Sequence, residues 1–200
     1  MKGLRFLQIA LLMACQALII GCASSPASSF YILSPLPEAK ARQGTLLEGG
    51  ISLGIGPLAL PDYLDRPQMV SGVGAQRIEV DEFQRWGGSL RDDIANTLGE
   101  NLAYLLGTSR VVVLSSEFKL PVRYRLAVNI LRFEADNEGQ ASLKVRWALL
   151  DSNAEVALAV RESDYRRSFD RVDQDAKVSA LSATLADFSR EVADTIRLLP

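Results

Sequence analysis

The sequence of 200 residues lacks histidine altogether, and its two cysteines, Cys15 and Cys22, lie within the first 22 residues. The lack of histidine excludes Ser-His-Asp and Cys-His nucleophile pairs, the usual catalytic zinc sites and imidazole acid-base chemistry near neutral pH. The placement of the cysteines leaves no disulfide and no thiolate site for the body of the chain. These absences predict a protein that is not an enzyme and that carries no cofactor and no metal.

Basic residues are not in excess either, since 22 Lys and Arg face 24 Asp and Glu and the formal net charge is −2. Proteins that bind nucleic acid neutralise phosphates with a surplus of positive charge, so we expect no nucleic-acid partner. A composition of 48% hydrophobic and 23% charged residues is typical of a globular protein, and the length suits one domain.

The N-terminus has the pattern of a signal peptide. Lys2 and Arg5 precede an apolar run of 16 residues, Phe6 to Gly21, which two glutamines interrupt. A helix that spans a bilayer needs about 20 apolar residues, so an uncleaved membrane helix is the weaker alternative. We predict a lipoprotein signal peptide over residues 1–21.

The end of this run, Ile19-Ile20-Gly21-Cys22, resembles the bacterial lipobox, and Leu12-Met13-Ala14-Cys15 is a weaker match. The resemblance implies cleavage before Cys22, which would carry diacylglycerol on its sulfur and an acyl group on its nitrogen. Several acyl chains hold a protein at a membrane effectively without release. Ala23 stands where an aspartate would be the inner-membrane retention signal, which implies the inner leaflet of the outer membrane, facing the periplasm.

Residues 22–29 would then form the lipidated N-terminus and a short tether, followed by a single domain over 30–200. Small and polar residues fill positions 23–28, as in flexible linkers, and these six residues reach about 20 Å at most. Loss of Lys2 and Arg5 with the signal peptide leaves 20 basic and 24 acidic residues, a net charge of −4.

The first part of the domain predicts short strands. Runs rich in β-forming residues at 30–33 and 51–56 are bounded by Ser, Pro and Gly, and runs at 68–73 and 77–80 suggest a hairpin. Residues 57–67 contain three prolines in 11 positions, so we expect a loop there, neither central strand nor helix interior.

A helix is predicted to begin after Ser89, with Asp92 placed as in a capping box and Gly107 as the stop. Its apolar face consists of residues spaced by three or four positions: Leu90, Ile94, Leu98, Leu102 and Leu105. A short buried strand at 111–114 follows, so residues 77–114 predict a strand-helix-strand unit that forms a right-handed crossover on a sheet.

From Tyr124 the apolar positions alternate with polar ones, as in a sheet with one buried face. They are Leu126, Val128 and Ile130 and, after a turn at 136–139, Leu143, Val145, Trp147 and Leu149. Val156, Leu158 and Val160 begin a third strand, whose phase changes near Arg161 as at a β-bulge and which ends near Phe169.

The last helix is the strongest, with Asp173 as a candidate cap. Its apolar face consists of Val178, Leu181, Leu185, Phe188, Val192, Ile196 and Leu199. Helices and strands that are apolar on one side bury each other. We therefore predict an α/β two-layer sandwich, a mixed β-sheet with two long amphipathic helices packed on one face.

The loop around Tyr63 is the most distinctive stretch, because aromatic and aliphatic side chains stand beside prolines that reduce the entropy lost on docking. It is either a partner-binding loop or a segment in which Tyr63 and Leu64 pack on the sheet while Asp65 and Arg66 pair locally. Arg85 and Trp86 either contact a partner or lipid headgroup, or fix the start of the helix. The predicted partner-binding residues are Leu60, Pro61, Asp62, Tyr63, Leu64, Asp65, Arg66, Pro67, Arg85 and Trp86.

Two charged sets have alternative interpretations. One mixes acids with Arg161, Arg166, Arg167 and Arg171, and it is either a site for anionic headgroups or, as mixed signs usually indicate, a solvated face. The other set is two carboxylate pairs, Asp62 with Asp65 and Asp92 with Asp93, which would be the minimum for a glycosidase. A helix start explains the second pair, and no pocket is evident for the first.

Several motifs together resemble the ABC-type transport auxiliary lipoproteins, which are similar to the paraquat-inducible protein C lipoproteins. The motifs are Ile55-Gly56-Pro57, the core Pro61-Asp62-Tyr63-Leu64-Asp65-Arg66-Pro67-Gln68, Arg85-Trp86, Glu100-Asn101-Leu102 and Leu106-Gly107. The resemblance implies an outer-membrane component of a lipid-trafficking system whose partner is a mammalian-cell-entry (MCE) domain protein. It would be a non-enzymatic docking adapter that supports membrane integrity, and homo-oligomerisation is expected. The alternatives are a lipid carrier with an apolar cavity, or a cell-wall hydrolase or its activator.

Overall fold

The structure is a computed structural model that describes residues 3, 27–41, 51–73, 76–114, 120–152, 156–170 and 174–199. The predicted lipidation site Cys22, the weaker candidate Cys15, Arg171 and the candidate cap Asp173 lie outside these ranges. So does the signal peptide, apart from Gly3. None of the helices in the described ranges is both long enough and apolar enough to cross a membrane.

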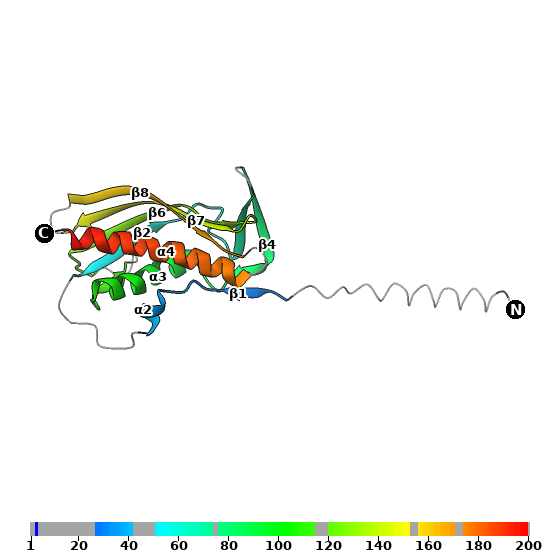
Figure 1. Cartoon of the computed structure of the whole chain (residues 1–200), viewed down its shortest axis with the longest axis horizontal. Coiled ribbons are helices and arrows are strands. Elements are labelled where there is room, and N and C mark those ends of the chain that lie inside the picture. The colour runs from blue at the N-terminus through cyan, green and yellow to red at the C-terminus, as the bar shows by residue number, and fades with distance from the viewer. Residues whose placement is uncertain are drawn as a thin grey trace.

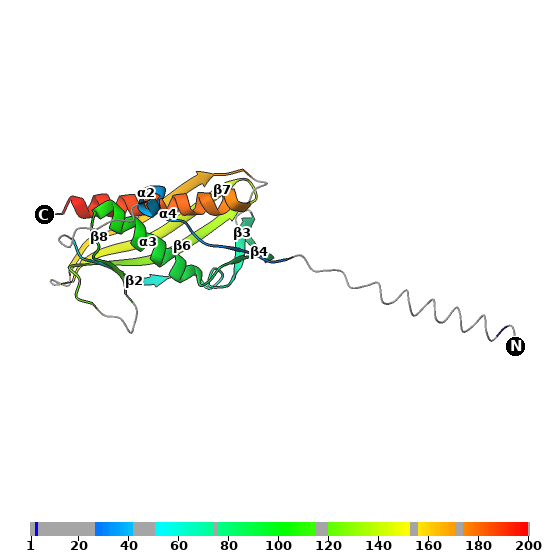
Figure 2. The same cartoon turned by 90° about the horizontal axis from the view of Figure 1, so that it is seen from below.

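Eight strands form one mixed sheet, and the helices cover one of its faces (Figures 1 and 2). The predicted two-layer sandwich with both long helices on one face is thereby confirmed. In chain order the elements are β1 Ser29–Tyr31, α2 Pro37–Ala41, β2 Leu53–Ala59, β3 Gln68–Val73, β4 Arg77–Trp86, α3 Leu90–Leu106, β5 Val111–Val113, β6 Tyr124–Asp136, β7 Gln140–Asp151, β8 Val156–Ser168 and α4 Gln174–Arg197.

Strand β6 is the centre of the sheet. Along one edge it pairs with β7, which pairs in turn with β8, and this antiparallel meander confirms the alternation read from Tyr124 onward. Along the other edge β6 pairs in parallel first with β2 and then, at Ala135 and Asp136, with β3. Strand β5 lies beyond β2, whereas β4 and β1 lie beyond β3.

The predicted crossover over 77–114 is wrong. Crossovers of that kind join parallel strands. Strand β4 is antiparallel to β3, while β3, β6, β2 and β5 are parallel along the sheet, so β4 and β5 run in opposite directions. They also lie toward opposite ends of the strand order β1-β4-β3-β6-β2-β5. The reason is that β3 pairs with the C-terminal end of β6, at Ala135 and Asp136, whereas β2 pairs with its N-terminal half.

The predicted loop over 57–67 is wrong at its start, because β2 continues through Pro57 to Ala59. The Gly56–Pro57 peptide is cis, and the register with β6 shifts between Ile55 and Leu58. Strand β5 pairs only with Leu53 to Ile55, so Pro57 lies past the point where its missing N–H would be needed. The loop proper spans residues 60–67.

The phase change in the third strand of the meander lies at Leu158, not near Arg161. Leu149 pairs with Ala159 and Leu150 pairs with Ala157, which leaves Leu158 as the extra residue of a bulge. Beyond the bulge, Val160 stands opposite Ala148 and points away from the helices. It is 66% exposed.

The core lies between the sheet and the two long helices, where Trp147 of β7 meets Phe188 of α4 edge to face at 6.0 Å. Helix α3 begins as predicted, with the Ser89 hydroxyl accepting from the Asp92 amide, and it ends at Gly107, whose φ is 66°. Its predicted apolar residues are buried except for Leu105, which is partly buried.

Candidate functional site

The loop over 60–67 carries most of the predicted partner-binding residues, and its apolar side chains face the core. Leu60 and Leu64 are buried, whereas Asp62, Asp65, Arg66 and Pro67 are exposed and Pro61 and Tyr63 are partly so. The loop is held by the Leu64 amide, which donates to the Pro61 carbonyl at 2.9 Å. The two leucines of the loop are therefore part of the core, and only its exposed and partly exposed residues can reach a partner directly.

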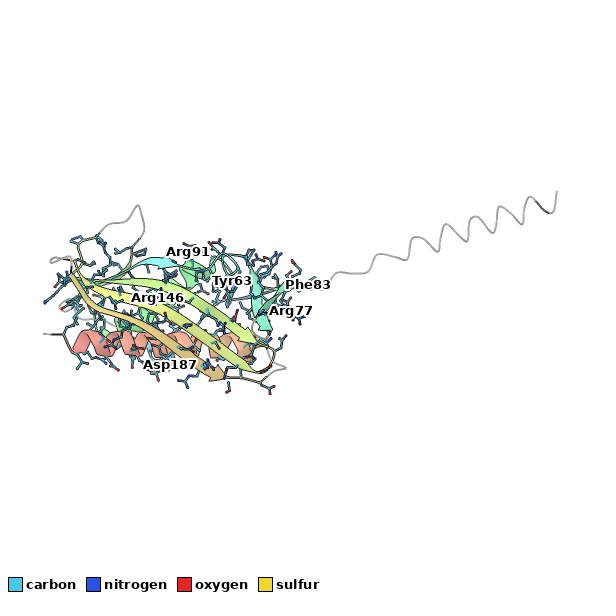
Figure 3. All side chains as sticks on the ribbon, turned by 90° about the horizontal axis from the view of Figure 1, so that it is seen from above. Tyr63, Arg77, Phe83, Arg91, Arg146 and Asp187 are labelled. Atoms are coloured by element: carbon cyan, nitrogen blue, oxygen red, sulfur yellow. The ribbon has the colours of Figure 1, made fainter. Side chains whose placement is uncertain are left out.

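Asp65 pairs with a helix rather than with its neighbour Arg66. Its carboxylate lies 2.7 Å from the guanidinium of Arg91 on α3, which also donates to the Leu58 carbonyl. Figure 3 shows Arg91 and Tyr63 close to the same edge of the molecule. The local pair expected between Asp65 and Arg66 is replaced by this contact between loop and helix.

Tyr63 joins the loop to β6 through Glu134. Burial raises the pKa of Tyr63 to about 12, and the nearby Glu134 carboxylate, to which the phenol is hydrogen-bonded, acts in the same direction. Glu134 is itself largely buried and is paired with Arg132 at 3.3 Å. The phenol is thus held protonated over an unusually wide pH range.

Arg85 and Trp86 end β4, and they behave differently from one another. Trp86 is buried, and its amide donates to the Pro67 carbonyl at 2.8 Å, so this residue fixes the end of the loop. Arg85 is partly exposed and donates to the Glu82 carbonyl. Of this pair only Arg85 is placed for direct contact with a partner.

The arginines of β8 are engaged by acids of α4 and of the strand itself. Arg167 binds both oxygens of Asp187, at 2.8 and 2.7 Å, which raises its pKa. Arg161 pairs with Glu191 at 3.4 Å, and Arg166 pairs with Asp164 at 3.3 Å. This supports the interpretation of a solvated, charge-balanced face.

An N-terminal strap, which we define as residues 29–37, was not singled out by the sequence. Its amides are held by side chains of both long helices: Leu33 donates to Asp93 Oδ2 at 2.8 Å, and Leu36 donates to Asn101 Oδ1 at 2.7 Å. Ser34 donates to Ser182 Oγ at 3.1 Å. Burial raises the pKa of Asp93, although the bond from Leu33 opposes this. The one signal for these contacts was Asp93 and Asn101, polar residues eight positions apart on an apolar helix.

A groove of about 630 Å³ lies between the strap and α4. Its walls are formed by Phe30, Ile32 and Pro35 on one side and Val178, Ser182 and Ala186 on the other. The volume falls within the range of ligand sites, but the groove is only partly enclosed.

The face of the sheet away from the helices, the outer sheet face, is shown in Figure 3 with Arg146 labelled. It contains a shallow depression of about 370 Å³, lined by small or apolar residues and two polar ones: Ala59, Ala127, Asn129, Arg146, Ala148 and Val160. Beside it Glu162 accepts from Lys144 at 3.0 Å and from Arg146 at 2.8 Å, and these bonds lower its pKa. An apolar centre with a polar rim is the usual layout of a protein interface.

The two carboxylate pairs that could serve a glycosidase lie at positions with a structural explanation or on the exposed surface. Asp93 holds the strap, Asp92 lies at the first turn of α3, and Asp62 and Asp65 lie on the exposed rim of the loop. Within the described part of the chain, no three Cys, Asp or Glu side chains are grouped so that they could hold a metal ion.

None of the curated proteins gives a significant match to the sequence. Among solved structures, that of an uncharacterized protein has a TM-score of 0.69 at 21% identity, covering 86% of this chain and 99% of that one. Protein XCC0632 from Xanthomonas campestris, of the DUF330 family, has a TM-score of 0.65 at 17% identity, covering 84% and 97%. These likenesses show a shared fold.

The sequence itself gives a more specific match. Residues 31–193 match the family model of the ABC-type transport auxiliary lipoprotein component. The match runs from the strap through the meander and most of α4, so it covers both layers of the sandwich. The chain therefore belongs to the ABC-type transport auxiliary lipoprotein family.

Proposed function

We propose that this protein is a non-enzymatic docking adapter of an intermembrane lipid transport system that supports membrane integrity. Acyl chains on Cys22 hold it in the inner leaflet of the outer membrane, and the domain faces the periplasm. There it engages the MCE-domain protein of the same system. Membership of a family of transport auxiliary lipoproteins supports this proposal, as does the lipobox-like sequence before Cys22.

The proposal rests mainly on the uncovered apolar residues of the outer sheet face. A two-layer sandwich buries one face of its sheet under helices, and here the other face presents Ala127, Ala148 and Val160 without such cover. Exposed apolar side chains grouped on a surface mark interaction sites more often than isolated ones do. A partner packed on this face would supply the missing layer.

The exposed and partly exposed members of the predicted set remain proposed partner contacts: Pro61, Asp62, Tyr63, Asp65, Arg66, Pro67 and Arg85. The buried members of the set would act indirectly, by fixing the position of the exposed loop residues: Leu60, Leu64 and Trp86. A ring or tube of MCE domains has several equivalent docking positions, so we expect several copies of the adapter to assemble around it.

The proposal is tested by pull-down of the MCE-domain protein with the full-length lipoprotein in detergent. Val160→Asp places a charge on the outer sheet face, and we expect it to abolish or strongly weaken capture. Asn96→Asp is the matched control, because Asn96 is exposed on α3 of the helical layer. Equal capture by both variants would count against the outer sheet face. Failure of the wild type to capture the partner would count against the adapter function.

The lipid-carrier alternative is favoured by one feature, the groove beside the strap. A carrier would retain lipid through purification, and mass spectrometry of the extracted protein would detect lipid in excess of the covalently attached acyl chains. We expect no such excess, since the groove is only partly enclosed and would leave much of an acyl chain in water.

A further inference from the structure

Large exposed apolar side chains gather at the end of the domain where β1 and β4 lie side by side, the β1–β4 end (Figure 1). Phe30 and Ile32 on the strap are 66% and 67% exposed, and Phe83 on β4 is 37% exposed. Phe83 precedes Gln84, the residue that pairs with Ser29 of β1, so Phe30 and Phe83 lie on neighbouring strands, and Ile32 follows directly after β1. Figure 3 shows Phe83 at this end of the molecule.

Phe30 and Ile32 are exposed because the hydrogen bonds of the strap fix the direction of their side chains. Successive residues of an extended segment point to opposite sides. Tyr31 and Leu33 point to the core, and the strap is fixed in that orientation by the Leu33 amide on Asp93 and by the Gly87 amide on the Tyr31 carbonyl at 2.7 Å. Phe30 and Ile32 therefore cannot turn inward while these bonds persist.

This patch lies close to the proposed anchor along the chain. Phe30 lies eight positions after Cys22, and eight steps of about 3.5 Å span no more than about 28 Å. A surface tethered so closely to a bilayer meets it at a high effective concentration. Each large apolar side chain that leaves water for the acyl region adds to the attraction between this end of the domain and the bilayer.

The charges around the patch distinguish binding to anionic headgroups from insertion of apolar side chains. Arg85 is paired with Glu82, and Asp81 accepts the amides of Phe83 and Gln84. Arg167 and Arg190, which line the groove beside Phe30, both pair with Asp187, and Asp175 lines the same groove. Among the described residues, these charges leave no surplus of positive charge around the patch. Attraction to anionic headgroups would require such a surplus. Apolar insertion into the interfacial region requires only the exposed side chains.

We propose that Phe30, Ile32 and Phe83 insert into the leaflet that holds the acyl chains of Cys22 and so set the orientation of the domain on the membrane. The inference rests on the proposed lipid anchor. It places the β1–β4 end against the bilayer and leaves the outer sheet face free for the partner protein.

The test uses the full-length acylated lipoprotein reconstituted into phosphatidylcholine vesicles, with or without brominated acyl chains that quench tryptophan. Phe30→Trp is compared with Val160→Trp, since both wild-type residues are 66% exposed, and the signal of the buried Trp86 and Trp147 is subtracted with the wild type. We expect the added emission of Phe30→Trp to shift to the blue on reconstitution and to be quenched several-fold more strongly than that of Val160→Trp. High salt should leave the difference unchanged.

Equal quenching of the two variants would overturn the inference, and so would quenching that vanishes at high salt. A blue shift of Phe30→Trp that depends on protein concentration without vesicles would assign the patch to a second copy and would also overturn it. The anchor is checked separately by the intact mass of the protein and by flotation with vesicles. Absence of acylation would therefore be recognised as failure of the proposed function. Thermal unfolding confirms that both variants fold as the wild type does.

Discussion

At the scale of single residues, a few polar side chains among apolar neighbours decide how the surface segments are held. Tyr63 is the clearest case, since its phenol reaches from the loop to the largely buried Glu134 on β6. An ordinary tyrosine releases its proton near pH 10, whereas burial and Glu134 raise the pKa of Tyr63 to about 12. The folded chain therefore binds this proton more tightly than the unfolded chain does.

This difference predicts a pH dependence of stability. A group whose pKa is raised on folding contributes stability that is complete below its unfolded pKa and is lost as pH rises through the folded pKa. Between pH 10 and 12 the free energy of unfolding should fall more steeply for the wild type than for Tyr63→Phe, which has no phenol to titrate. Urea unfolding across that range measures both slopes, with Tyr165 present in both proteins. Parallel slopes would contradict the raised pKa of Tyr63, and with it the partly buried position of the phenol beside Glu134.

At the scale of elements, the strap is the segment through which the tether is joined to the domain. Any pull between the membrane and the domain passes through residues 29–37 and thus through their bonds to α3 and α4. Asn101 is fully buried and is central to this arrangement, because it accepts from Leu36 and donates to Ser189 at 3.1 Å.

Asn101→Ala should therefore destabilise the domain by about 1–3 kcal/mol, since it leaves the buried Leu36 amide without its acceptor. Asn96→Ala, at an exposed position of the same helix, should change stability by no more than about 0.5 kcal/mol. Urea unfolding compares the two. The strap should also become accessible to protease in Asn101→Ala while α3 stays protected. Equal stability of the two variants would show that the strap is held by its apolar contacts alone.

The sequence predicts elements well where the pattern is long and one-sided. The two long helices and the strands β6 and β7 repeat their apolar positions over many residues, and their faces were read correctly. The order of strands was not predictable, because nothing local records that β2 and β3 share one edge of β6. The position of the bulge was misplaced for a similar reason: Leu158 and Val160 are as apolar as core residues, yet Val160 faces outward.

The candidate site was predicted only in part. The loop was identified from its prolines and aromatic residue, but burial of Leu60, Leu64 and Trp86 depends on packing against distant strands and helices. The groove and the outer sheet face were not identified, because each is made by segments far apart in the sequence. The strap was missed because only its contacts with distant residues of α3 and α4 distinguish it. Ile32 and Val160 were noted only as strand residues, since exposure cannot be read from residue type.

At the scale of the whole molecule, the sandwich has three distinct surfaces. The helical layer closes one face of the sheet (Figures 1 and 2). The β1–β4 end carries the exposed side chains of Phe30, Ile32 and Phe83, and the outer sheet face carries the apolar depression. In the proposed arrangement the membrane and the partner protein occupy different surfaces. One small domain can then hold both at once.

The central claim, that the outer sheet face of a lipid-anchored protein grips an MCE-domain partner, is tested most directly by photo-crosslinking in intact cells. Benzoylphenylalanine replaces Val160 on the outer sheet face or, as the control, Asn96 on the helical layer, and irradiated adducts are identified by mass spectrometry. The account predicts an adduct with the MCE-domain protein from position 160 and none from position 96. The account would be contradicted if position 160 gave no adduct with the MCE-domain protein. It would also be contradicted if positions 160 and 96 gave adducts with that protein in equal yield.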